Sequence, residues 1–185
     1  WPLSGNAFDK ILFQILTDQN TYPRKLRTGE LHLSSLSPSQ YRTEVLQGED
    51  DSPFKDGTLK NGEFWSHTYY YIGWNSVTPY FNDKRVRQAM THAFNADMLL
   101  NDVMMGLGQR CTGPMPAFLP FYDKTLEPYA FDLERAKQLL EEAGWTDSDG
   151  NGIRDKEVGG SRMEFDFNLL IYGSSKEYKT IGDIF

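Results

Sequence analysis

An acidic loop in the last quarter of the chain has the spacing of a metal site. Residues 147–158 read DSDGNGIRDKEV. Asp147, Asp149 and Asn151 stand at positions 1, 3 and 5 of an EF-hand-type calcium loop, with a glycine at position 6 and Asp155 at position 9. Because calcium prefers oxygen ligands, this order predicts a calcium site formed by Asp147, Asp149, Asn151 and Asp155.

The same loop departs from the calcium pattern in two places. Position 12, which should supply a bidentate glutamate, is Val158, and Glu157 comes one place early. The apolar residue expected at position 8 falls at position 7, as Ile153, and Gly159-Gly160 follows where a helix should begin. The alternative is a turn whose side chains bond their own backbone before a final strand. Both interpretations stay open.

Other chemistry-bearing residues form no recognisable constellation. His32, His67 and His92 are scattered, and His92 is expected on the polar side of a helix. Cys111 is the sole cysteine, which excludes an internal disulfide and a cysteine-based zinc site. No Gly-x-Ser-x-Gly, Walker or GxGxxG motif occurs, so the sequence favours binding over catalysis.

An aromatic segment over residues 64–75 is the second candidate site. Its β-propensity predicts a strand through residues 69–74, with most of its rings in the core. Ligands gather at the carboxyl ends of strands in open α/β sheets. Trp74 and Asn75 would supply an apolar wall and a polar fixing group there, so we expect this pair to face a ligand cleft; the alternative is an ordinary structural role at the end of the strand.

The elements that must position these residues alternate along the chain. Alternating or apolar runs predict strands at residues 9–18, 30–34, 69–74 and 163–172. Capping residues and helical spacing predict helices over residues 20–28 and from Ser37, Asp83, Asn95, Asp132 and Ser174. This order indicates an α/β layer, interrupted by a polar, mobile loop over residues 47–63.

The helix expected from Asp132 has the clearest apolar stripe. Its predicted inward residues are Leu133, Ala136, Leu139, Leu140 and Ala143, and Gly144 is expected to end it. The helix expected from Asp83 carries Val86, Ala89 and Met90 at the same spacing. Both helices are therefore interpreted as scaffold.

Composition excludes several classes of protein. The 185 residues include 19 basic and 26 acidic ones, which gives a net charge of −7 and argues against nucleic-acid binding. No apolar run reaches the roughly 18–20 residues that span a bilayer. The chain opens at Trp1-Pro2-Leu3 without Met, so we expect a removed signal peptide or further upstream sequence, and the last helix looks cut as well.

The order of several motifs resembles a known family. They are residues 71–75 (YIGWN), 79–89 (PYFNDKRVRQA), 93–95 (AFN), 106–108 (GLG), 113–116 (GPMP), 129–132 (YAFD) and 136–145 (AKQLLEEAGW). Together they are similar to family 5 extracellular solute-binding proteins, the oligopeptide- and dipeptide-type receptors of ABC importers. The acidic loop also looks like a version common in that family.

The resemblance implies a fold and a function. Family members have two α/β lobes that close on a ligand, and this chain resembles part of the second lobe, residues 1–185. The implied fold class is α/β, a partial lobe of a periplasmic-binding-protein type II fold with a mixed sheet flanked by helices. The implied function is capture of a peptide or other small solute for a membrane permease. The implied location is periplasmic or extracellular, with a lipid anchor left open.

Two other functions remain open at this point. A calcium-dependent extracellular interaction domain would use the acidic loop, and calcium would then be its cofactor. An enzyme on a similar two-lobed fold is the other alternative, although no nucleophile–base pair supports it. The solute-binding interpretation needs no cofactor.

Overall fold

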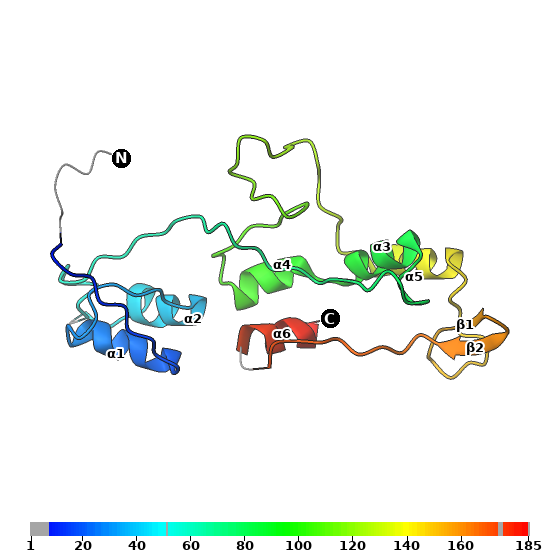
Figure 1. Cartoon of the computed structure of the whole chain (residues 1–185), viewed down its shortest axis with the longest axis horizontal. Coiled ribbons are helices and arrows are strands. Elements are labelled where there is room, and N and C mark those ends of the chain that lie inside the picture. The colour runs from blue at the N-terminus through cyan, green and yellow to red at the C-terminus, as the bar shows by residue number, and fades with distance from the viewer. Residues whose placement is uncertain (1–7, 51, 174–175, 185) are drawn as a thin grey trace. The chain divides into compact units, whose positions relative to one another are not determined.

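The chain divides into two compact units. The structure, a computed structural model, describes residues 8–50, 52–173 and 176–184. The units are Trp1–Gly62 and Glu63–Phe185, and Figure 1 traces their elements in chain order. The boundary falls at the end of the loop predicted over residues 47–63, whose described residues lie in no helix or strand.

Short helices build the first unit. The 3₁₀ helix Gln19–Thr21 leads into α1 (Tyr22–Arg27), and α2 (Pro38–Gln40) continues as the π-helix Tyr41–Leu46. The Ser37 hydroxyl accepts a hydrogen bond from the Gln40 amide at 3.3 Å, and the Gln40 side chain accepts one from the Ser37 amide at 3.0 Å. This reciprocal capping box confirms the helix start predicted at Ser37.

Capped helices also build the second unit. They are α3 (Lys84–Ala93), α4 (Ala96–Met98) with the π-helix Leu99–Val103 behind it, α5 (Leu133–Glu142) and α6 (Lys176–Ile184). The carboxylates of Asp83 and Asp132 and the amide oxygen of Asn95 accept backbone N–H groups of the first turns at 2.8–3.0 Å. All three predicted caps are confirmed. The start predicted at Ser174 lies outside the described residues.

The described sheet is one antiparallel hairpin. Strand β1 (Asp155–Val158) pairs with β2 (Ser161–Glu164), with Val158 opposite Ser161 and Asp155 opposite Glu164. Gly159 and Gly160 between them have φ values of 61° and 81°. Positive φ at both central residues is the geometry of a two-residue hairpin turn, which glycine adopts without strain.

Three predicted strands are wrong in this structure. Residues 9–18, 30–34 and 69–74 form no strand, and of residues 163–172 only the first two lie in β2. A strand needs a neighbour to bond its N–H and C=O groups, and no described segment pairs with these. Phe13 and Ile15 are accordingly 87% and 94% exposed. The described residues therefore do not form the mixed sheet that was expected.

The core of the second unit lies between α3 and α5. Arg85 of α3 donates to the Glu142 carbonyl, and the Asp132 amide donates to the His92 carbonyl at 2.9 Å, so the two helices run antiparallel. The buried cluster consists of Phe81, Val86, Ala89, Met90, Ala136, Leu139, Leu140, Ala143 and Trp145. Figure 1 shows the two helices side by side, next to the hairpin.

One residue predicted inside this core is exposed. Leu133 is 50% exposed, although it shares a helical face with Ala136 and Leu140. It is the first residue of α5 and lies where the contact with α3 ends, so half of its surface stays exposed. None of the helices that the structure describes has the length and apolar character needed to cross a bilayer.

Candidate functional site

The end of α5 places the acidic loop, defined here as residues 147–155. Gly144 has φ +88°, which lets the chain reverse after the helix. Trp145 follows, is fully buried, and stacks on Tyr80 with ring centroids 5.9 Å apart. Thr146 and Asp155 then exchange backbone hydrogen bonds of 3.0 and 2.6 Å, which closes the loop at its base.

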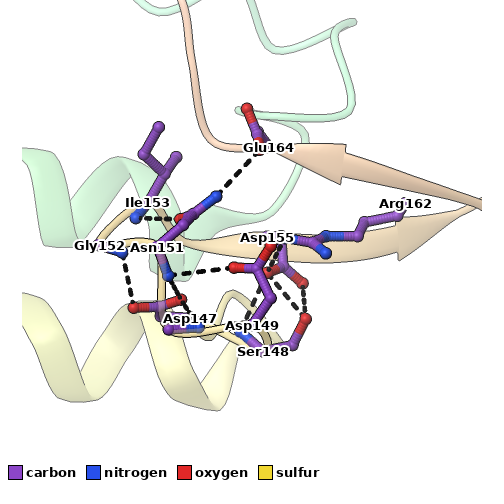
Figure 2. Close-up of polar contacts among 10 residues, drawn as sticks. Asp147, Ser148, Asp149, Asn151, Gly152, Ile153, Asp155, Arg162 and Glu164 are labelled. Atoms are coloured by element: carbon purple, nitrogen blue, oxygen red, sulfur yellow. Dashed lines mark hydrogen bonds and ion pairs between the residues drawn. The ribbon is translucent and has the colours of Figure 1, made fainter.

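Side chains of the loop bond its own backbone. One Asp147 carboxylate oxygen accepts the amides of Gly150 and Asn151 at 2.8 and 3.1 Å, and the other accepts that of Gly152 at 3.0 Å. The Asn151 amide oxygen accepts the Ile153 amide at 2.7 Å. Figure 2 shows Asp147 and Asn151 with these bonds inside the loop. This pattern is the one that the self-bonded turn predicts.

Asp155 ties the loop to the hairpin. Its carboxylate accepts hydrogen bonds from the Ser148 amide at 3.0 Å and from the Ser148 hydroxyl at 2.8 Å. The Arg162 guanidinium lies 3.2 Å from the same carboxylate and 2.5 Å from that of Asp149 (Figure 2). Asp155 is only 5% exposed, and these partners stabilise its buried charge.

Three of the four predicted calcium ligands gather. Asp147, Asp149 and Asp155 each offer one carboxylate oxygen, and these oxygens lie within 4.8 Å of one another. The fourth predicted ligand, Asn151, accepts the Ile153 amide through its side-chain oxygen at 2.7 Å, and its NH₂ donates to Glu164 at 3.2 Å. Calcium binding by the loop stays a prediction.

Electrostatics favour ionised carboxylates here. Arg162 lowers the pKa of Asp149 below its ordinary value of 3.8, mainly through their direct hydrogen bond. The Ser148 amide, then its hydroxyl, lowers the pKa of Asp155 below 3.8, and the Arg162 charge adds to this while burial opposes it. Both groups are therefore anionic at neutral pH and bind cationic partners.

Sequence reasoning missed Arg162. The signal that could have found it is Gly159-Gly160, because two consecutive glycines are typical of a hairpin turn. In the calcium pattern the same glycines count only as a departure. Such a turn folds the following strand back over the loop. Residues opposite each other in an antiparallel pair share a face, so Arg162, opposite Glu157, lies on the face that Asp155 also occupies.

The second candidate site lies at the edge of the core. Trp74 is half-buried, with its ring centroid 4.7 Å from that of Phe81 and 6.0 Å from that of Phe167. Asn75 is exposed, and its side-chain oxygen accepts the Val77 amide at 3.2 Å. Both residues thus have a structural role, and their contact with a ligand stays a prediction.

An open hollow lies elsewhere, beside the acidic loop. Its lining consists of Tyr80, Asp149, Arg162, Met163, Glu164 and Asp166.

Among the residues that the structure describes, no histidine belongs to a metal-type cluster. The His92 ring nitrogen Nδ1 lies 2.8 Å from the Ala130 carbonyl oxygen, and this contact joins α3 to the segment before α5.

Sequence comparison identifies relatives over most of the chain. The oligopeptide-binding protein AppA of Bacillus subtilis is 30% identical over 159 residues, which are 85% of this chain and 27% of AppA. The di/tripeptide-binding protein 3 of Pseudomonas aeruginosa is 29% identical over 144 residues, 78% of this chain and 26% of that protein. The chain thus spans about a quarter of the length of these relatives.

Solved structures of peptide-binding proteins also match most of this chain. AppA in complex with a nonapeptide matches 80% of this chain and 28% of its own, with 29% identity and a TM-score of 0.63. DppA of Helicobacter pylori, in complex with the peptide STSA, matches 70% of this chain and 24% of its own, with 26% identity and a TM-score of 0.55. NikA of Brucella suis, at 24% identity, has the same fold.

These neighbours confirm the expected fold class, part of a type II periplasmic-binding fold. The relatives are named for binding rather than for a reaction. The family profile described as bacterial extracellular solute-binding proteins, family 5 Middle, matches residues 1–185. The chain therefore belongs to the family 5 bacterial extracellular solute-binding proteins.

Proposed function

We propose that the protein captures a peptide outside the cytoplasm and delivers it to the membrane permease of an ABC importer. The observation that carries this proposal is the family match over residues 1–185, joined to relatives named for oligopeptides and for di- and tripeptides. The proposal involves binding without chemistry on the ligand, and it requires no cofactor.

The described core suits a rigid part of such a receptor. Two antiparallel helices and the hairpin pack on one aromatic cluster, in which Tyr80, Phe165 and Trp145 contact one another with centroids 4.8–5.9 Å apart. Close-packed interiors move as units, so such a part closes on a ligand by hinge motion rather than by internal rearrangement.

Trp74 and Asn75 are the proposed ligand contacts within this chain. The Asn75 side-chain oxygen is engaged in its own turn, whereas its NH₂ group donates to none of the described residues. That group suits the carbonyl oxygen of an extended peptide, and the half-buried Trp74 ring beside it supplies an apolar wall. Ligand chemistry beyond a peptide backbone is not part of this proposal.

A binding experiment tests both the ligand class and the pair. Mass spectrometry of the purified protein under native conditions should detect co-purified peptides, and calorimetry with a peptide pool should give saturable heat. Asn75→Ala should weaken binding about 10-fold, because a buried hydrogen bond to the ligand is lost. Asn101→Ala, on the exposed surface of the π-helix Leu99–Val103, is the matched control and should bind like the wild type.

The outcomes separate the two claims. If calorimetry shows no heat of peptide binding and mass spectrometry detects no co-purified peptide, the proposed ligand class is overturned. Peptide binding that Asn75→Ala leaves unchanged would keep the function and reject the assignment of the site.

A further inference from the structure

The acidic loop already contains a cation supplied by the chain. The Arg162 guanidinium bridges two of the three gathered carboxylates, with Nη2 2.5 Å from an Asp149 oxygen and 3.2 Å from an Asp155 oxygen. A calcium ion that used the three carboxylates would have to bind the same two carboxylates as Arg162. A guanidinium and a divalent cation repel each other at such distances, so the two cations compete.

The remaining ligands of the loop are engaged as well. Both Asp147 oxygens accept backbone amides, and Asp155 is held by Ser148. Calcium requires six to eight oxygen ligands, whereas position 12 of the pattern is Val158 and offers no carboxylate. A metal ion would have to replace internal donors at several atoms at once.

The hairpin holds Arg162 beside Asp149 and Asp155, where it competes with a metal ion for these carboxylates. Its two-residue turn sets the register that places Arg162 on the Asp155 face of the sheet. Met163, the next residue, packs against the core cluster and anchors this stretch of β2. The guanidinium is therefore held near the carboxylates by the fold itself, rather than by a flexible segment.

We propose that Arg162 is a built-in cation of the acidic loop, which neutralises Asp149 and Asp155 and keeps divalent cations out. The loop resembles a calcium site in sequence, yet it is closed by an intramolecular ion pair. Release of Arg162 would leave the Asp149 and Asp155 carboxylates without this cation and therefore raise the affinity of the loop for calcium. This proposal does not rest on the proposed peptide contacts of Trp74 and Asn75.

Calorimetric titration of the metal-free protein with calcium chloride tests the proposal. Arg162→Gln should bind calcium at least about 10-fold more tightly than the wild type, because the ion no longer displaces a charged hydrogen-bond donor. Arg162→Lys keeps the charge and should stay close to the wild type. Lys137→Gln removes an exposed positive charge from α5 without touching the loop, and it controls for net charge.

A double variant shows which carboxylate accounts for the added calcium affinity. Asp149→Asn in the Arg162→Gln background should abolish the added affinity, because Asp149 is one of the two carboxylates released. Circular dichroism confirms that each variant is folded before its calcium affinity is compared with that of the wild type. Equal calcium affinity in wild type and Arg162→Gln overturns the proposal. Absence of calcium binding in both overturns it too, because Arg162 would then not be what excludes the ion.

Discussion

Asp155 joins three parts of the second unit through its side chain and its backbone. It accepts from Ser148 of the loop, pairs with Arg162 of β2, and its backbone bridges to Thr146 behind α5. A buried carboxylate with such partners is stabilising only while it is ionised. The stability of this region therefore depends on the charge of Asp155.

Acid should remove that contribution. The pKa of Asp155 is lower in the folded protein than its ordinary value of 3.8, so the carboxylate stabilises the fold above 3.8. This contribution is lost as the pH falls through the folded-state pKa. Urea unfolding should show the wild type more stable than Asp155→Asn at neutral pH, with the difference shrinking below pH 3.8. A difference that persists unchanged in strong acid would contradict this.

At the scale of elements, α3 and α5 are stabilised mainly by their contact with each other. Val86 and Ala89 of α3 are fully buried, and Leu139 of α5 is 4% exposed. Tertiary packing of an apolar stripe, rather than helix propensity, supplies most of the stability of such 10-residue helices.

A pair of substitutions on one helix tests this. Leu139→Ala should lower the free energy of unfolding by about 2–5 kcal/mol, because it leaves a cavity between α3 and α5. Leu133→Ala makes the same chemical change at a 50% exposed position of α5 and should cost less than about 1 kcal/mol. Denaturant unfolding followed by circular dichroism measures both. Equal losses would show that α5 is stabilised by propensity alone.

Element prediction succeeded where the signal was local. Asp83, Asn95 and Asp132 cap their own helices, so their neighbours in sequence were sufficient to find them. Strand prediction failed at residues 9–18 because alternation gives a strand two faces but does not supply a partner. Residues 163–167 show the difference, since Met163, Phe165 and Phe167 alternate as predicted and pack on the core although β2 ends at Glu164.

At the scale of the whole molecule, packing is uneven along the chain. The buried cluster of the second unit lies within residues 81–145, whereas residues 9–18 and 64–72 carry many exposed apolar side chains without regular structure. Local stability follows burial and hydrogen bonding. Opening of α3 and α5 should therefore require more free energy than opening of those segments.

Amide hydrogen exchange measures this difference. After correction for intrinsic rates, amides in the middle of α3 and α5 should exchange about 100-fold or more slowly than those of residues 9–18 and 64–72. Peptide-resolved mass spectrometry of the whole protein is sufficient to see it. Protection of residues 9–18 comparable to that of α5 would show that this segment pairs in solution.

The sequence by itself determined the family, the fold class, the helix caps and the position of the acidic loop. Each of these depends on residues close together in the chain or on the order of short motifs. The tertiary structure decided which apolar faces are covered, as Leu139 and Leu133 show, and which cation the acidic loop holds. Arg162 reaches Asp149 only because a hairpin brings it back across 13 residues, and contacts of that kind depend on chain reversal that spacing alone does not specify.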